Sequence, residues 1–392
     1  MVNIIMKKIK LEQFEGLRGV AAVIVFLSHI QKTFFPEYDI VTIAFFKEHL
    51  FNKYFAVIAQ SFITIFFKGH IAVNIFWIMS AYVLTKNFFT IEIEKLTKQL
   101  QLAICKRYFR LMIPAGVSIL IAYLMMKLNL FYDQNLVESS HLFQNNWIGY
   151  QYFYEPDFYV AVRTIFWNTF FDYNKGVNYN SSLWTLGPEF FGSLFCFFSL
   201  FLIYKNNNRF YIYLLLIAVA VLYKSNWLLS FIFGLILSDY DNSSFNEGSF
   251  VNKIKIIEIK VFRIHVLPVI LLGVVVVMIA FGGRFFGATI LESLIIVFLV
   301  LKSKYLTSFF SRRFFVWLGK VSFSFYLIHV LVICSFTCFL YLNIDMAETP
   351  KVILITLLSF ILLLFLSHVY TKIVDENAIR VANKIGNFFV KR

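Results

Sequence analysis

Two ionisable side chains, Arg18 and His29, lie eleven positions apart in the stretch FEGLRGVAAVIVFLSHI, residues 14–30, and the residues between them are almost all apolar. In a helix, eleven positions at about 100° each make roughly three full turns, so both side chains point to the same face. They are about 16 Å apart along the axis, which predicts Arg18 at the cytoplasmic surface and His29 beyond the middle of the membrane. Ionisable groups inside a membrane are costly, so such a histidine indicates a functional site. A histidine that only hydrogen-bonds to a neighbouring helix is the alternative.

A second histidine occurs in the stretch GKVSFSFYLIHV, residues 319–330. There Ser322, Tyr326 and His329 follow i, i+4, i+7 spacing and line one face of a predicted helix. This helix is expected to begin near Leu318, so His329 should lie at a depth similar to that of His29. Two histidines at one depth predict a shared polar cavity.

Glu189 follows Pro188 in SSLWTLGPEFFG, at the predicted outer end of an apolar segment. A carboxylate in the first turn could stabilise the start of a helix. It could also reach the same cavity from outside.

Three cations, Lys106, Arg107 and Arg110, come directly before another apolar segment in CKRYFRLMIP. Arg107 and Arg110 share a helix face, and guanidinium groups bind phosphate oxygens well. The alternative is that these cations only anchor the cytoplasmic end of a membrane helix. Together with the deep histidine, they favour a cytoplasmic donor that carries phosphates.

The elements that must position these residues are membrane helices. Of the 392 residues, 60% are hydrophobic and 20% aromatic, which predicts an all-α polytopic membrane protein rather than a soluble domain. A span needs about 20 apolar residues, and residues 51–67 form an interrupted apolar segment that is interpreted as interfacial or re-entrant. The ten predicted spans lie near 17–35, 70–89, 111–131, 185–204, 210–223, 225–238, 264–281, 286–301, 318–342 and 350–371.

The net charge of +14 is interpreted as a marker of topology rather than of nucleic-acid binding. With ten spans and both termini in the cytoplasm, 26 of the 36 Lys and Arg residues are cytoplasmic. The chain is then one transmembrane domain, 1–392, with spans from about 17 to 371 and a basic cytoplasmic tail at 372–392. The outer loop 132–181 is rich in aromatic and amide side chains, which suit either sugars or the membrane interface.

The four cysteines have no paired C-x-x-C spacing, so neither a disulfide framework nor a zinc site is expected. No other metal-ligand spacing is present, and we expect no metal and no permanently bound cofactor.

Five segments together resemble the signature of the membrane-bound acyltransferase-3 family, which includes O-acetyltransferases of bacterial lipopolysaccharide and exopolysaccharide. They are FEGLRGVAAVIVFLSH, GHIAVNIFWIMSAYVL, KRYFRLMIP, SLWTLGPEFF and VSFSFYLIH, in this order along the chain. The resemblance covers about residues 11–380, and it extends to no fused soluble esterase-like domain.

This resemblance implies transfer of an acyl group, usually acetyl from acetyl-CoA, to a sugar hydroxyl of a surface glycan such as O-antigen, exopolysaccharide or capsule. It implies a multi-pass protein of the bacterial cytoplasmic (inner) membrane, whose partners are acetyl-CoA, a free or lipid-linked glycan and membrane lipids. The residues to which it points are Arg18, His29, Arg107, Arg110 and Glu189, together with Tyr326 and His329.

The residues themselves suggest a mechanism for such a reaction. The imidazole of His29 is suited to take a proton from a sugar hydroxyl, with Arg18 and Glu189 as the other catalytic candidates. Whether His29 is a base or carries the acyl group itself stays open, as does the oligomeric state. A transporter or flippase of lipid-linked sugars is one rival interpretation, because it also needs a polar cavity. A structural membrane protein, in which the histidines only join helices, is the other.

Overall fold

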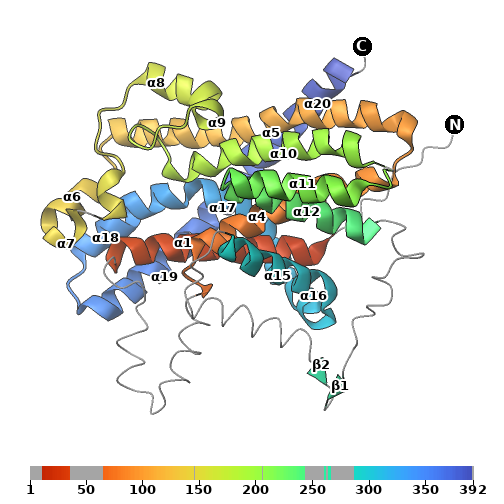
Figure 1. Cartoon of the computed structure of the whole chain (residues 1–392). Coiled ribbons are helices and arrows are strands. Elements are labelled where there is room, and N and C mark those ends of the chain that lie inside the picture. The colour runs from red at the N-terminus through yellow and green to blue at the C-terminus, as the bar shows by residue number, and fades with distance from the viewer. Residues whose placement is uncertain are drawn as a thin grey trace.

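The computed structural model describes residues 11–35, 65–144, 146–204, 206–242, 260–261, 264–265 and 287–390. In this part of the chain the long helices form one bundle, in which they run roughly along a common direction (Figure 1). The long helices are α1 (Glu12–Phe34), α4 (Gly69–Thr85), α5 (Ile93–Lys127), α10 (Leu186–Ile203), α11 (Arg209–Leu222), α12 (Asn226–Asn242), α15 (Ala288–Lys302), α17 (Arg313–Val332), α19 (Glu348–Tyr370) and α20 (Glu376–Val390).

Short helical segments connect these elements. They are η1 (Lys86–Thr90), α6 (Asp133–Ser139), α7 (His141–Gln144), η2 (Trp147–Tyr150), α8 (Phe158–Arg163), η3 (Thr164–Asn168), α9 (Thr169–Phe171), η4 (Ser181–Thr185), α16 (Lys304–Phe310), η6 (Ile333–Thr337), α18 (Cys338–Asn343) and η7 (Thr371–Asp375). Two-residue strands, β1 (Lys260–Val261) and β2 (Ile264–His265), pair antiparallel. Helices α6, α7 and α18 lie at one end of the bundle, and α16 lies toward the other (Figure 1).

Six helices in the described ranges are long and apolar enough to cross a membrane. They run over Glu12–Phe34, Gly69–Phe89, Glu94–Lys127, Ser181–Ile203, Arg313–Asn343 and Glu348–Val390. These match six of the ten predicted spans, so the expectation of a polytopic helical membrane protein is confirmed.

The remaining four predicted spans have different outcomes. Helices α11, α12 and α15 occupy three of them but have only 14, 17 and 15 residues. The fourth, 264–281, and the interrupted segment 51–67 fall almost entirely outside the described residues. The count of ten and the cytoplasmic side of both termini therefore stay predictions.

Helices α1 and α17 touch backbone to backbone through glycines. A Cβ atom on Gly319 would lie 1.9 Å from the carbonyl oxygen of Glu15, and one on Gly19 would lie 2.7 Å from the amide nitrogen of Gly319. One turn earlier, a Cβ on Gly16 would lie 2.0 Å from the carbonyl oxygen of Phe310 in α16. Small residues allow this close approach, and dispersion contacts along the two backbones then stabilise the helix pair.

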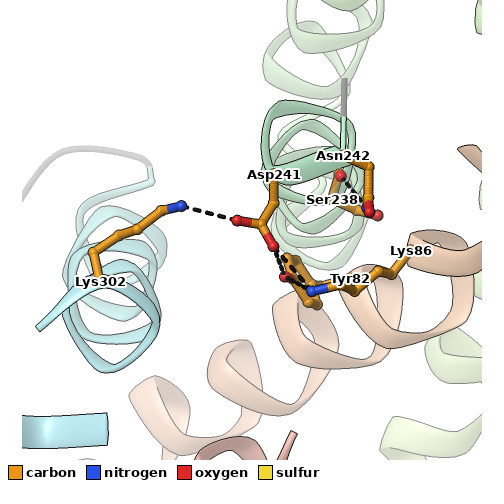
Figure 2. A network of polar contacts seen from close by, with 6 residues as sticks. All are labelled: Tyr82, Lys86, Ser238, Asp241, Asn242 and Lys302. Carbon is orange, nitrogen blue, oxygen red and sulfur yellow. Dashed lines mark hydrogen bonds and ion pairs between the residues drawn. The ribbon is translucent and has the colours of Figure 1, made fainter. Parts of the chain in front are cut away.

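A charged cluster joins α4, α12 and α15 (Figure 2). Asp241 accepts hydrogen bonds from Tyr82 at 2.5 Å, from Lys86 at 2.9 Å and from Lys302 at 2.8 Å. Burial opposes the charge of Asp241, but these donors outweigh it and keep its pKa below the usual range. The cluster fixes α12 and α15 against α4, which in turn packs against α1.

The predicted basic tail contains an amphipathic helix, α20, that packs along the first half of α5. Its buried residues Ala378, Ala382 and Gly386 are spaced by four and share one face. A Cβ on Gly386 would lie 2.6 Å from Cγ of Lys106, so the Lys106 side chain lies against α20.

We expect Gly319→Ala to destabilise the protein, because the added methyl group clashes with backbone atoms that cannot move aside singly. Overpacking of this kind costs about 1–3 kcal/mol or more, which should appear as a lower thermal midpoint in detergent. Gly176→Ala is the control, since its nearest neighbour would be Oδ1 of Asn174 at an ordinary 3.5 Å. If both variants unfold at the wild-type thermal midpoint, the packing of α1 against α17 does not depend on this contact.

Candidate active site

The two histidines meet between α1 and α17. Nδ1 of His29 lies 3.3 Å from Nε2 of His329, and the ring centroids are 5.0 Å apart. Each histidine follows its helix-contact glycine, Gly19 or Gly319, by ten residues. The glycines fix the register of the two helices, so the two imidazoles also lie side by side, about 15 Å farther along the axis. The structure brings both histidines to one depth, as their spacing predicts.

Aromatic and amide groups from the loop 132–181 cover one side of the histidine pair, near the end of α1. The ring of Trp147, in η2, lies 4.5 Å from that of His29. Beside it, Nδ2 of the buried Asn146 donates a hydrogen bond of 2.6 Å to the carbonyl oxygen of Thr33, near the end of α1. The loop thus contacts His29 directly.

A cavity of 630 Å³ lies on the other side, between the starts of α1 and α17 and parts of α4, α5 and α10. This volume is within the range typical of small-molecule sites. Its charged and polar lining residues are Glu12, Glu15, Arg18, Ser80, Arg107, Arg110, Thr185, Glu189, Lys320, Ser322 and Tyr326. The other lining residues are apolar, and they include Phe76 and Trp77.

A buried ion pair between Arg107 and Glu189 forms part of the cavity wall. The Arg107 guanidinium donates to the carboxylate of Glu189 and to the hydroxyl of Ser80, and its Nε donates to Ser193 at 2.7 Å. Ser80 in turn donates to Glu189 at 2.5 Å. Serines from α4 and α10 thus supply further hydrogen bonds to the pair.

The helix boundaries explain why these two residues meet. Helix α5 begins at Ile93, well before the predicted span at 111, so Arg107 lies inside a helix rather than at its start. Glu189 lies in the first turn of α10, as its position after Pro188 predicts, and η4 places this turn eight residues after the start of the apolar span Ser181–Ile203. The short helix η4 precedes α10 within the same span, so the first turn of α10, with Glu189, lies inside the bundle.

The other predicted cations differ in what they touch. Arg110 makes a two-point pair with Asp375 of η7, with distances of 2.5 and 3.1 Å. Arg18 lies 3.5 Å from Glu15, and both remain partly exposed at the cavity. Lys106 faces α20 and is not among the cavity-lining residues.

Tyr326 separates the cavity from the histidine pair. Its hydroxyl lies 2.9 Å from Oγ1 of Thr185 and 2.9 Å from the carbonyl oxygen of Ser182. The ring of Tyr326 lines the cavity and lies 5.5 Å from the ring of His329. A group entering from the cavity therefore meets Tyr326 before it reaches the imidazoles.

Among the described residues, no group of three or more His, Cys, Asp or Glu side chains could hold a metal ion. All four cysteines are free thiols, and three of them are buried. The described residues thus offer no alternative, metal-based site beside the cavity and the histidines.

The predicted residues thus fall into two connected groups. Arg18, Arg107, Arg110, Glu189, Ser322 and Tyr326 line the cavity, and Tyr326 also contacts the second group, which His29 and His329 form. Their chemical roles stay predictions. Sequence reasoning missed Ser80, Ser193, Thr185 and Asp375 as partners and did not single out Trp147. An acidic residue shortly after a predicted span was the one available signal for Asp375.

The chain belongs to the acyltransferase-3 family, because the family model described as an acyltransferase domain matches residues 11–370. It is therefore a membrane acyltransferase by family, and the resemblance seen in the sequence motifs is confirmed. Neither the curated proteins nor the solved structures gave a significant match.

We expect Arg107→Met or Glu189→Leu alone to destabilise the protein by about 3–5 kcal/mol, because each leaves the other charge buried without its partner. The two side chains are only 13% and 16% exposed. Replacing both at once should restore much of the stability, and thermal unfolding of the four proteins in detergent measures this coupling. Strictly additive losses would show that the two charges do not depend on each other.

Proposed function

We propose that this protein transfers an acetyl group from acetyl-CoA to a hydroxyl of a bacterial surface glycan, in the cytoplasmic membrane. One observation carries the proposal: a cavity lined by arginines meets a histidine pair at Tyr326, and a loop rich in aromatic residues covers the opposite side of that pair. Such an arrangement suits a donor and an acceptor that approach the imidazoles from two sides.

The donor end is assigned to the cavity. Arg18, Arg110 and the exposed Lys320 line it near the starts of α1 and α17, where they can contact phosphate oxygens. Arg110 uses two nitrogens for Asp375, but a guanidinium has five N–H donors, so others remain for a ligand. Arg107 supports the site through its pair with Glu189, and Lys106 through its contact with α20.

The acyl transfer itself is assigned to His29. The acceptor oxygen attacks the thioester carbon, an ester C–O bond forms, and the C–S bond breaks. The hydroxyl proton moves to His29 and from there to the departing thiolate, so the products are the acetylated sugar and the free thiol. If the imidazole carries the acetyl group first, the same ring nitrogen forms the bond, so either route requires one unprotonated nitrogen on His29.

The acceptor end is assigned to the loop 132–181. Trp147 packs against His29, and sugars present C–H faces that stack on aromatic rings as well as hydroxyls that hydrogen-bond. The hydrogen bond from Asn146 to the carbonyl oxygen of Thr33 holds the neighbouring Trp147 ring near His29.

Purified protein given radiolabelled acetyl-CoA and isolated glycan should label the glycan. A transporter or flippase of lipid-linked sugars, or a purely structural protein, would leave it unlabelled. Free hydrolysis of the donor without labelled glycan would rule out the proposed acceptor class.

In this assay, His29→Ala should lower turnover by about 10²–10⁴-fold, because it removes the proposed base. Excess donor should not restore the rate. His368→Ala is the matched control, since this exposed histidine of α19 lies outside both the cavity and the loop 132–181. A His29→Ala protein that works at the control rate would return His29 to a structural role.

The variant Arg110→Gln should instead raise the donor KM by about 10- to 100-fold, since it removes one charge-assisted phosphate contact. Excess donor should recover most of the rate. Because Asp375 loses its partner, Arg110→Gln with Asp375→Asn is measured as well, and it should show the same KM defect. An unchanged KM in both would exclude Arg110 from donor binding.

Trp147→Ala should weaken acceptor use more than donor use, because it removes the ring that covers the acceptor side of His29. We expect roughly 5- to 100-fold poorer use of the glycan, which is the effect of about 1–3 kcal/mol. The acceptor and donor KM values measured on the same protein test this. Trp167→Ala is the control, as this exposed ring of the same loop packs on Phe171 instead.

A further inference from the structure

The nitrogens of the two imidazoles are arranged so that their protons can be assigned. Nδ1 of His329 lies 2.6 Å from the carbonyl oxygen of Tyr326. Nδ1 of His29 lies 2.9 Å from the carbonyl oxygen of Val25 and 3.3 Å from Nε2 of His329. Three of the four ring nitrogens are thus placed by these contacts.

The assignment follows from what each partner can do. A carbonyl oxygen only accepts, so Nδ1 of His329 carries the proton and Nε2 of the same neutral ring carries a lone pair. Nδ1 of His29 then faces two acceptors, a carbonyl oxygen and that lone pair, so it also carries a proton. The lone pair of neutral His29 is left on Nε2.

We infer that His329 is a positioning residue for the acyl transfer: its Nε2 accepts a hydrogen bond from Nδ1 of His29 and so keeps the reactive lone pair of His29 on Nε2. The role of His329 in catalysis rests on the proposed function. The hydrogen bond between the two histidines and the proton positions do not depend on it.

The arrangement also favours the charge that develops during the reaction. When Nε2 of His29 takes the acceptor's proton, the ring becomes an imidazolium and its Nδ1–H becomes a stronger donor. The lone pair of His329 and the carbonyl oxygen of Val25 then stabilise this cation. A neutral imidazole thus takes the orienting place that a carboxylate fills beside other catalytic histidines.

Burial explains why His329 is the partner and not a second base. Its side chain is 1% exposed, and its Nδ1 is held by its own helix. Its Nε2 points at His29 and is shielded from the cavity by Tyr326. Proton exchange with a substrate therefore passes through His29.

Two substitutions separate hydrogen bonding from packing. His329→Leu removes the acceptor but still fills the space between the helices. His329→Gln provides a carbonyl oxygen that can accept a hydrogen bond from His29. We expect His329→Leu to lower kcat by about 10- to 100-fold with little change in donor KM, the usual cost of losing a residue that orients a functional imidazole. His329→Gln should recover a substantial part of the rate, and His368→Leu, at an exposed histidine of α19 outside the cavity and the loop, should leave kcat unchanged.

A double-mutant cycle distinguishes positioning from a separate structural role. In a His29→Ala background, His329→Leu should cause no further loss, because there is no ring left to orient. Equal losses with and without His29, or a Leu variant as fast as wild type, would overturn the inference.

A measurement independent of activity tests the proton assignment directly. In protein labelled with 13C and 15N at its seven histidines, the signals that His29→Ala removes should have the chemical shifts of a ring protonated at Nδ1. In His329→Leu they should move toward a mixture of the two neutral forms. A wild-type His29 protonated at Nε2 would refute the inference even if the glycan is acetylated, whereas the expected shifts without acetyl transfer would refute the proposed function alone.

Discussion

The glycine contact between α1 and α17 is the constraint on which the rest of the site depends. Gly19 and Gly319 let the two backbones touch, and this contact fixes both the distance and the register of the helices. Larger residues would hold helix axes about 8–10 Å apart, and the two imidazoles, ten residues farther on, would then not meet. Because lipid offers little hydrophobic driving force between helices, such close packing is one of the few ways to hold them together.

The polar groups between the cavity mouth and the histidine pair differ in charge and in the partners that they have. Arg107 and Glu189 neutralise each other and are surrounded by serine hydroxyls, which limits the cost of burying two charges. Arg18 and Arg110 have acidic partners but stay nearer the cavity mouth, where their remaining N–H groups are available to an anion. The deepest part uses neutral imidazole, hydroxyl and carbonyl groups, which cost less to bury than ions. Positive charge thus decreases along the path from the mouth to His29.

Much of this could be predicted from local patterns, and the rest depends on distant contacts. Periodicity was enough to place six apolar helices and to align His29 with His329, because helical rise and angle are the same everywhere. It placed Glu189 in the first turn of a helix but did not predict the short helix η4 before that turn, since η4 depends on how residues 181–185 pack against Tyr326. It also failed for the start of α5, because charged residues at 94–110 interrupt the apolar pattern there. The packing of α20 along this part of α5 stabilises the helix instead. The position of Asp375 shortly after a predicted span marks it as a candidate, but its pairing with Arg110, 265 positions away, cannot be predicted from local patterns.

The length of α5 has a consequence for how a large donor reaches the cavity. With 35 residues it is about 52 Å long, roughly 20 Å more than the hydrocarbon core of a bilayer. Part of α5 therefore extends past the lipid tails, and its first half, on which α20 packs, carries Arg107 and Arg110 of the cavity wall. A polar, multiply charged ligand arriving there would meet a protein surface instead of lipid headgroups. The repulsion between its phosphates and an anionic membrane surface would then fall during the last step of entry.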